Sequence, residues 1–316
     1  MNTSLESKLF LLKARAFMLS KARAFFLERN ILEVDCPILS PASSVDLHID
    51  VMSLQHQGQS FYLHTSPEYR MKRLLADGLG DIYQLGHVFR SEEKGKWHNP
   101  EFTMVEWYRL HQDYFFFIEE TISFISLFLP SIPVRYLTYR EAFLATVDVD
   151  PFLSSIEGLL NALRAKNIHP YSTTDISKTE VCQYILGTLI EPHLGKNEIT
   201  IIYDYPEEEA SLAQIYQKED QRVAKRFEIY YEGIELANGY HELQDKEELL
   251  RRLETNNALR LACGKRVLPI DDKFINAIEK GLPDCCGVAV GFDRLLALQY
   301  KLDSIAPILP FTWDEI

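Results

Sequence analysis

Residues 89–109 read FRSEEKGKWHNPEFTMVEWYR. A run of strand-forming residues ends at Arg90, a charged loop with one glycine follows, and an aromatic-rich strand pattern resumes after HNPEF. The pattern predicts an antiparallel hairpin with strands over about 82–90 and 102–110. Its loop is longer and more basic than a simple turn requires, so this end of the hairpin is a candidate binding site.

The side chains at this end suit a purine nucleotide. Arg90 carries a planar fork of donors that matches phosphate or carboxylate oxygens. Phe102 offers a flat apolar face, Glu92 can accept from an exocyclic amine, and Asn99 is a further candidate contact. Taken alone, the stretch is equally typical of a hairpin with a solvated charged loop. The hypothesis therefore depends on groups elsewhere in the chain.

A second candidate cluster lies in residues 233–243, which read GIELANGYHEL. Glu235 and Glu242 are an odd number of residues apart, so an uninterrupted strand would point them to opposite faces. A bulge or turn at ANG would bring the two carboxylates together. Because clustered carboxylates repel, such a pair normally holds a cation, and hard oxygen ligands suit Mg²⁺ beside nucleotide phosphates. The alternative is two unrelated surface glutamates.

A third cluster lies in residues 287–298, which read GVAVGFDRLLAL. Its glycine spacing differs from the G-x-G-x-x-G dinucleotide fingerprint. The pattern predicts a strand of small residues, which let a ligand approach the backbone, followed by a helix that carries Asp293 and Arg294. Arg294 would meet polyphosphate at a helix end whose dipole already favours anions. The alternative is tight packing of a helix on a sheet.

Composition limits the class of protein. Of 316 residues, 47 % are hydrophobic and 25 % charged, which is typical of a globular protein with a sizeable core. The net charge of −13 disfavours nonspecific nucleic-acid binding. Five cysteines without metal-type spacing favour a reducing compartment. No apolar run approaches the ~18 residues of a membrane span, and the N-terminus lacks a cleavage site. We therefore expect a cytoplasmic protein without membrane contact.

Helix signals are clearest near the N-terminus. An amphipathic helix is expected over about 4–29, with Thr3 and Glu6 as a capping box. A second helix is expected in TSPEYRMKRLLADG, where Thr65 or Ser66 can cap the start and the following proline suits the first turn.

The rest of the chain indicates the fold class. About 112–195 is expected to be mainly helical, and strands return at ITIIYDY, RFEIYYEGIELANGY and CGVAVGF. Further helices are expected at about 244–262 and after Gly291. Strands separated by turns as well as by helices predict an α+β fold, with a mainly antiparallel sheet flanked by helices. We see no repeat or flexible linker, so one domain over 1–316 is expected.

Taken together, these stretches resemble the catalytic domain of class II aminoacyl-tRNA synthetases, specifically the lysine type. Residues 30–39, NILEVDCPIL, look like motif 1, the element used at the dimer interface. FRSEE…HNPEFTMVEWY looks like motif 2, GVAVGFDR looks like motif 3, and GIELANGYHEL is similar to the metal-carboxylate segment of the lysine enzymes. The likeness runs from about residue 8 to about residue 300 and implies a homodimer.

Two departures narrow the resemblance. A lysyl-tRNA synthetase would carry an anticodon-binding domain before motif 1, which here begins near residue 30, so no anticodon-binding domain is expected. Ala289 stands where the lysine enzymes have glycine; its methyl group would trim the amino-acid pocket by roughly one carbon, worth on the order of 1–3 kcal/mol. With TSPEYRMKRLL, these features are similar to the elongation factor P β-lysine ligase family, bacterial paralogues of lysyl-tRNA synthetase. One local departure is Ser91, where that family usually has asparagine.

The resemblance implies an ATP-dependent ligase that activates (R)-β-lysine as its adenylate. It would transfer the β-lysyl group to the ε-amine of a lysine on elongation factor P, with Mg²⁺ as cofactor and without tRNA. Because the attacking carboxylate is already ionised, catalysis would depend on positioning and charge neutralisation, with no general base.

Site residues follow from the resemblance, position by position. The catalytic residues are Arg90 and Arg294. The ATP site comprises Arg90, Ser91, Glu92, Asn99, Phe102, Glu235, Leu236, Gly291 and Arg294. The substrate site comprises Ser66, Pro67, Glu68, Tyr108, Glu242 and Ala289. The metal ligands are Glu235 and Glu242. Arg90 would hold the α-phosphate and the substrate carboxylate, and Phe102 and Arg294 would sandwich the adenine.

Two other functions are compatible with the motifs. A minimal synthetase could charge tRNA with α-lysine, which the negative net charge and the expected lack of an anticodon-binding domain disfavour. An inactive paralogue could sense lysine or nucleotide. Retention of Arg90, Arg294 and the carboxylate pair argues against a sensor, because sensing alone does not require activation of the α-phosphate.

Overall fold

The computed structural model describes residues 5–169 and 176–316. The chain divides into two compact units: unit 1 comprises Met1–Pro130 and Glu242–Ile316, and unit 2 comprises Ser131–His241. The capping box expected at Thr3 lies outside the described residues. The expectation of a single domain over the whole chain stays a prediction.

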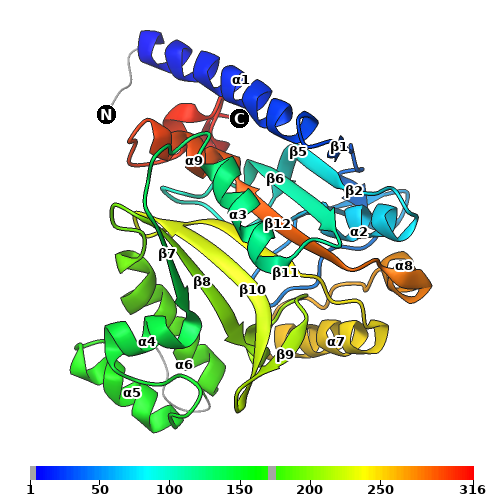
Figure 1. Ribbon diagram of the computed structural model, residues 1–316. Coiled ribbons are helices and arrows are strands. Elements are labelled where there is room, and N and C mark those ends of the chain that lie inside the picture. Colours follow the sequence, from blue (N-terminus) through cyan, green and yellow to red (C-terminus); the bar gives the residue numbers. More distant parts are fainter. Residues whose placement is uncertain (1–4, 170–175) are drawn as a thin grey trace. The chain divides into compact units, whose positions relative to one another are not determined.

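Unit 1 contains a sheet in the order β1-β5-β6-β12 (Figure 1). The β1–β5 pair is parallel, and β5–β6 and β6–β12 are antiparallel. A smaller antiparallel sheet has the order β2-β4-β3. The strands of unit 1 are β1 (Leu32–Glu33), β2 (Leu39–Ser40), β3 (Ser53–His56), β4 (Gln59–Leu63), β5 (Ile82–Phe89), β6 (Glu101–Leu110) and β12 (Cys285–Gly291).

The hairpin predicted from the opening stretch is present and confirmed. In β5 and β6, Val88 pairs with Phe102 and Phe89 pairs with Glu101. Arg90 follows directly, and its backbone N–H donates to the Pro100 carbonyl at 2.8 Å. The alternating pattern was sufficient to predict these strands because both are consecutive and joined by one loop.

Helices α3, α7 and α8 of unit 1 begin at aspartate caps, whereas the N-cap of α2 is Pro67, which has no side-chain cap. Asp113 accepts from the N–H groups of Phe115 and Phe116 at the start of α3, and Ser66 Oγ accepts from Glu68 N–H at 3.0 Å at the start of α2. The helices of unit 1 are α1 (Leu5–Leu27), α2 (Glu68–Ala76), α3 (Tyr114–Ile125), α7 (Lys246–Ala262), α8 (Asp272–Gly281) and α9 (Phe292–Gln299).

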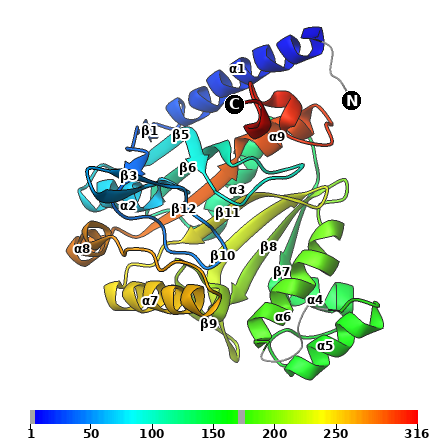
Figure 2. The same ribbon diagram turned by 180° about the vertical axis from the view of Figure 1, so that it is seen from behind.

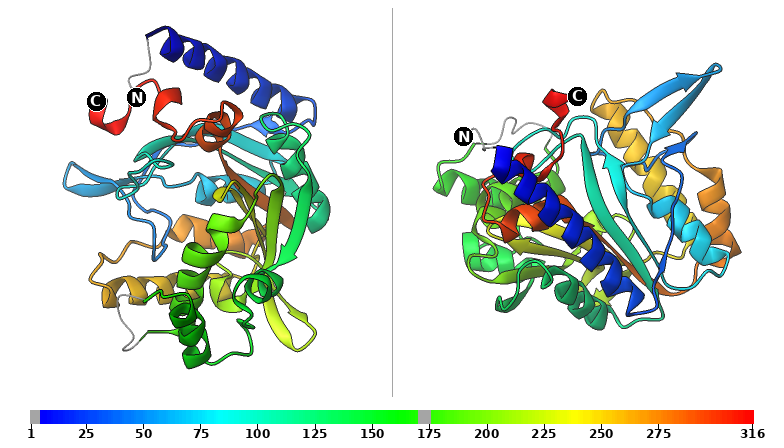
Figure 3. Two further views of the ribbon diagram at one scale, coloured as in Figure 1. Left: turned by 90° about the vertical axis from the view of Figure 1, so that its left-hand side faces the viewer. Right: turned by 90° about the horizontal axis from the view of Figure 1, so that it is seen from above.

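Helix α1 lies beside the C-terminal segment, which includes the 3₁₀ turns Ala306–Ile308 and Trp313–Glu315 (Figure 3). Arg15 anchors the helix: it is buried and donates to Asp293 at 2.5 Å and to Thr103 Oγ1 at 2.6 Å. An apolar core beneath α1 includes Phe26, which stacks on Tyr83 with ring centroids 4.1 Å apart. Arg15 thus ties α1 to β6 and α9.

On another part of unit 1, α8 packs against both α2 and α7 (Figure 2). Tyr69 of α2 stacks on Phe274 of α8 at 4.1 Å between ring centroids. The predicted helices over 4–29, 244–262 and after Gly291 match α1, α7 and α9, with ends that differ by a few residues.

Unit 2 contains strands in the order β11-β10-β8-β7, with β9 paired to β10. The β7–β8 pair is parallel, and the β8–β10, β9–β10 and β10–β11 pairs are antiparallel. Its strands are β7 (Val134–Thr138), β8 (Ile199–Pro206), β9 (Ile215–Lys218), β10 (Gln221–Tyr231) and β11 (Ile234–His241). The sequence prediction of an α+β fold with a mainly antiparallel sheet is confirmed.

Helices of unit 2 cover one part of its strands with a continuous apolar core that includes Phe143, Leu163 and Ile185. They are α4 (Tyr139–Val147), α5 (Ile156–Ala165) and α6 (Lys178–Ile185), followed by a π-helical turn Leu186–Ile190 and 3₁₀ turns Glu191–His193 and Glu207–Glu209. Capping boxes at Thr138 and Ser177 start α4 and α6. Across residues 5–169 and 176–316, every helix is too short or too polar to cross a membrane.

Candidate active site

The register of β6 and β12 brings motif 2 and motif 3 residues together. Gly287 pairs with Tyr108, and Ala289 pairs with Glu106. Directly opposed residues on neighbouring strands share one face of the sheet, with Cβ atoms ~4.5–5.5 Å apart. The Ala289 methyl group therefore lies beside the base of the Glu106 side chain, on the face that carries Tyr108.

A buried polar cluster occupies this face. Glu106 accepts hydrogen bonds from Ser66 Oγ at 2.6 Å and from the Tyr108 hydroxyl at 2.8 Å. Lys72 Nζ contacts Glu68 at 2.6 Å and Glu242 at 2.5 Å. The residues thus converge from α2, β6 and the segment after β11, and four of them were predicted from the sequence as substrate contacts.

Burial dominates the electrostatics of this cluster. Burial, together with the Glu68 charge, raises the pKa of Glu106 to about 7, although hydrogen bonds from Ser66 and Tyr108 act in the opposite direction. Burial likewise raises the pKa of Glu242 to about 8, while the Lys72 ammonium acts to lower it. Burial acts to lower the pKa of Lys72, but the charges of Glu242 and Glu68 outweigh it and raise that pKa. The cluster thus sets three carboxyl groups against one ammonium group, and a cationic ligand bound there would favour the ionised form of Glu106 and Glu242.

Gly287 permits the close packing of this cluster. A Cβ atom built at Gly287 would lie 2.3 Å from Glu242 Oε1 and 2.3 Å from Tyr108 Cε1. No L-residue with a side chain fits there unless Tyr108 or Glu242 moves. The small residues of β12 therefore let neighbouring side chains pack close to its backbone.

Arg90 and Phe102 lie at the end of the hairpin, as predicted. The Arg90 guanidinium is 5.2 Å from the centre of the Phe102 ring and donates to Glu93 at 3.1 Å. Its Nε is buried and has no hydrogen-bond partner among the described residues. A buried donor without an acceptor is costly, so this group suits an anionic ligand such as a phosphate or carboxylate.

Arg294 faces the loop that joins β5 to β6. It donates from Nε to the Trp97 carbonyl at 3.2 Å, and its Nη2 lies 2.7 Å from His98 Nε2. Burial and the Arg294 charge lower the pKa of His98. Gly291 starts α9, three residues before Arg294 in the sequence. The two predicted catalytic arginines thus border the same loop.

The remaining predicted ATP contacts have different surroundings. Asn99 is buried, and its amide already donates to the Glu101 carbonyl at 2.7 Å and accepts from Trp313 N–H at 3.0 Å. Glu92 is exposed. Ser91 donates its backbone N–H to the Asp50 carbonyl at 2.9 Å, a contact that does not depend on the side chain at position 91. The nucleotide roles of Glu92 and Asn99 stay predictions.

Glu235 and Leu236 belong to β11 in unit 2. The ladder between β10 and β11 shifts between Ile229 and Tyr230, which leaves Leu236 as the extra residue of a bulge. The bulge thus falls one residue before the ANG stretch where the sequence predicted it.

Within unit 2, Glu235 lies among the carboxyl groups of Glu191 and Glu228, and Arg226 pairs with Glu228. Burial and the charges of Glu228 and Glu235 raise the pKa of Glu191 to about 7. Carboxyl oxygens are the ligands that a hard cation prefers, so Glu235 stays a candidate metal ligand. No group of three or more potential metal-ligating side chains is present in the part of the chain that the structure describes. The paired role of Glu235 and Glu242 stays a prediction.

Two members of the polar cluster were missed from the sequence. Glu106 lies inside the buried strand TMVEWY, where a carboxylate among apolar residues was a usable signal. Lys72 follows Glu68 by one helical turn, a spacing typical of an exposed ion pair, so nothing in the sequence indicated that it is buried.

Comparison with known proteins places this chain in a family. Residues 3–315 match the family model for tRNA synthetases class II (D, K and N). The chain belongs to this family of class II tRNA synthetases.

Among its relatives are proteins named elongation factor P–(R)-beta-lysine ligase. Those of Salmonella gallinarum and Salmonella typhi are each 43 % identical over 307 residues, which covers 95 % of this chain and 94 % of each relative. That of Salmonella arizonae is 42 % identical over the same length. The resemblance inferred from the four motifs is confirmed.

Proposed function

We propose that this chain is an ATP-dependent ligase that activates (R)-β-lysine and transfers it to a lysine side chain of elongation factor P. The similarity to proteins of that name over 95 % of the chain supports this function. The structural observation that carries it is the buried cluster of Glu68, Glu106 and Glu242, which lies in the same unit as Arg90. The carboxylates suit the two ammonium groups of an amino acid with an extra amine. The arginine suits a phosphate of ATP.

In the activation step, a carboxylate oxygen of β-lysine attacks the α-phosphorus of ATP. The new O–P bond replaces the bond to the bridging oxygen, and pyrophosphate leaves with the electron pair. Arg90 would hold the α-phosphate and the attacking carboxylate together, using the buried Nε as one donor. Arg294 would neutralise charge on the polyphosphate. Glu235 and Glu242 are the residues that would hold Mg²⁺, which would supply further positive charge for phosphate oxygens when bound.

The amine groups of β-lysine would bind in the polar cluster. Glu68, Glu106 and Glu242 offer acceptors, and Tyr108 and Ser66 orient Glu106. Ala289 lies opposite Glu106 and would limit the space around the bound amine.

In the transfer step, a neutral lysine ε-amine of elongation factor P attacks the carbonyl carbon of the adenylate. A C–N bond forms, the C–O bond to the phosphate breaks, and AMP leaves as the amine loses a proton. This chemistry requires the acceptor lysine to reach the adenylate, and we propose that it does so in the cytoplasm.

Pyrophosphate exchange tests the activation step. We expect labelled pyrophosphate to enter ATP with (R)-β-lysine, and to do so much more slowly with α-lysine. Arg90→Ala should abolish exchange while circular dichroism shows an intact fold. If neither (R)-β-lysine nor α-lysine supports exchange, the proposal is contradicted. Near-normal exchange by Arg90→Ala would also contradict it. Mass spectrometry of elongation factor P incubated with the enzyme, ATP and β-lysine would then test transfer.

Membership in the tRNA synthetases favours one alternative, which is charging of tRNA with α-lysine. A preference for α-lysine in exchange, followed by its transfer to tRNA, would support this alternative. A paralogue that only senses lysine or nucleotide would bind its ligand without exchange.

A further inference from the structure

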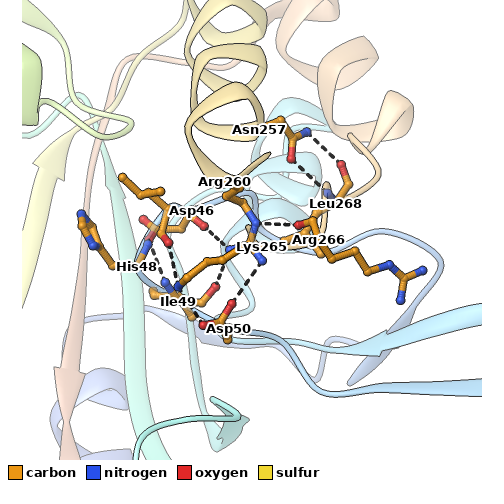
Figure 4. Close-up of polar contacts among 10 residues, drawn as sticks. Asp46, His48, Ile49, Asp50, Asn257, Arg260, Lys265, Arg266 and Leu268 are labelled. Carbon is orange, nitrogen blue, oxygen red and sulfur yellow. Dashed lines mark hydrogen bonds and ion pairs between the residues drawn. The ribbon is translucent and has the colours of Figure 1, made fainter. Parts of the chain in front are cut away.

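Residues 45–50 form an irregular segment between β2 and β3 that is held by one buried arginine (Figure 4). Arg260, in the last turn of α7, is 2 % exposed. It donates to the carbonyls of Asp46 at 2.6 Å and Ile49 at 3.1 Å, and to Asp50 Oδ1 at 3.2 Å. Its Nε donates to the Arg266 carbonyl at 2.9 Å. The fork of the guanidinium thus fixes the segment at several points.

A second cation strengthens this contact. Lys265 Nζ donates to the Leu47 carbonyl at 3.1 Å and to Asp50 Oδ2 at 2.8 Å. Burial acts to raise the pKa of Asp50, but the hydrogen bonds and charges of Lys265 and Arg260 outweigh it and lower that pKa. Asp50 is therefore an ionised carboxylate held from both sides, as Figure 4 shows.

The segment contacts the candidate active site through two backbone groups. The Asp50 carbonyl accepts from the Ser91 N–H at 2.9 Å, next to Arg90. At the other end, the Val45 N–H donates to the Tyr69 hydroxyl at 3.2 Å, next to Glu68. Residues 45–50 therefore connect the end of the hairpin that carries Arg90 with the helix that carries Glu68.

We propose that Arg260 and Asp50 are positioning residues, which hold residues 45–50 so that Arg90 and Glu68 keep the separation that adenylate formation requires. This inference rests on the proposed function for the roles of Arg90 and Glu68. It assigns a role to Arg260 and Asp50, which act on Arg90 and Glu68 through the contacts of Ser91 and Tyr69. Because reacting groups must align closely, a shift of about 1 Å at Arg90 is expected to slow the chemical step by up to ~100-fold.

The main test compares Arg260→Lys with Arg251→Lys. Both residues lie on α7, but Arg251 is exposed and pairs with Glu248. Arg260→Lys keeps the charge and loses the planar fork, so it cannot reach the same set of carbonyls. We expect kcat for pyrophosphate exchange, per folded molecule, to fall ~10–100-fold in Arg260→Lys with KM for β-lysine changed less than about 3-fold. Arg251→Lys should match the wild type.

Asp50→Asn provides a milder second variant. It preserves the side-chain shape and the backbone carbonyl that Ser91 contacts, and it removes the charge that Lys265 and Arg260 hold. We expect a smaller loss of kcat in the same direction. Wild-type kcat per folded molecule in both Arg260→Lys and Asp50→Asn would overturn the proposal.

Hydrogen exchange gives a readout that does not depend on enzymatic activity. The Ser91 amide should exchange its hydrogen ~10-fold faster in Arg260→Lys than in Arg251→Lys. Mass spectrometry of peptides that cover residues 86–93 measures this rate. An unchanged Ser91 rate would overturn the proposal. If the wild type shows no pyrophosphate exchange, the proposed function fails. The Ser91 rate then still decides whether Arg260 holds residues 45–50 against the end of the hairpin that carries Arg90.

Discussion

Glu106 is a carboxyl group in an environment that is costly for its residue type. It is 2 % exposed in the middle of β6, and burial with the Glu68 charge raises its pKa to about 7. Two hydroxyl donors, from Ser66 and Tyr108, only partly offset this. Such a costly group is typical of a binding site, because a cationic ligand stabilises a buried carboxylate more strongly than an exposed one.

Glu106→Gln should flatten the dependence of stability on pH. Between about pH 4.5 and pH 7 the folded state keeps a proton that the unfolded state has lost, so the free energy of unfolding falls as pH rises through this window. The amide removes this proton exchange at the same volume. We expect the variant to lose less stability than the wild type between pH 5 and pH 7.5, by on the order of 1–3 kcal/mol in urea titrations. Equal pH slopes would contradict the raised pKa of Glu106.

Ala289→Gly should relax discrimination toward α-lysine. The methyl group lies directly opposite Glu106 in the strand register, so its removal enlarges the space around the bound amine. One methyl group in a pocket changes the preference between two substrates by ~10-fold or more. The ratio of kcat/KM for β-lysine and α-lysine in pyrophosphate exchange measures this. An unchanged ratio would remove Ala289 from the pocket.

At the scale of elements, helix α1 depends on one buried ion pair. The sequence places Arg15 among charges that interrupt the apolar positions of an amphipathic helix, which is typical of a solvated face. The structure buries it against Asp293 and Thr103. Asp293 also accepts from the Thr103 backbone N–H at 2.8 Å, so one carboxylate joins α1, β6 and α9.

Arg15→Met should destabilise the protein by roughly 3–5 kcal/mol, because it leaves the Asp293 carboxylate buried without its cation. Arg23 lies on the same helix, and its ion pair with Glu33 is about half exposed. Arg23→Met should therefore change stability by less than about 0.5 kcal/mol. Thermal and urea unfolding of both variants measure the difference. Similar losses for the two would show that the Asp293 pair contributes no more than a surface contact.

Local pattern was sufficient for much of this architecture but not for its long-range contacts. The hairpin of β5 and β6 was predicted because consecutive residues determine it, whereas the cap of α2 was not, since its N-cap is Pro67 and, among the described residues, Ser66 Oγ accepts only from the Glu68 N–H. The contact of Arg260 with Asp50 joins residues 210 positions apart, and no periodicity reports such a pair. The bulge at Leu236 was misplaced by one residue because several positions in GIELANG can accommodate an extra residue.

At the scale of the whole molecule, motif 1 leaves apolar side chains in contact with solvent. Within residues 30–39, Leu32 is 50 % exposed, Ile38 is 41 % exposed and Leu39 is 45 % exposed. Neighbouring exposed apolar residues on a folded protein commonly mark an interface. We therefore propose that the protein forms a homodimer through this segment, as expected from the resemblance to motif 1.

A double substitution, Ile38→Asp with Leu39→Asp, should convert this dimer to a monomer. Two carboxylates at a self-complementary interface face their own copies across a twofold axis, so each substitution acts twice. Light scattering should show a mass near 73 kDa for the wild type, about twice the 36.6 kDa of one chain, and half of that for the variant. Leu153→Asp is the control, because Leu153 is 74 % exposed and lies in unit 2. A monomeric wild type would contradict the dimer, and a dimeric double variant would place its interface elsewhere.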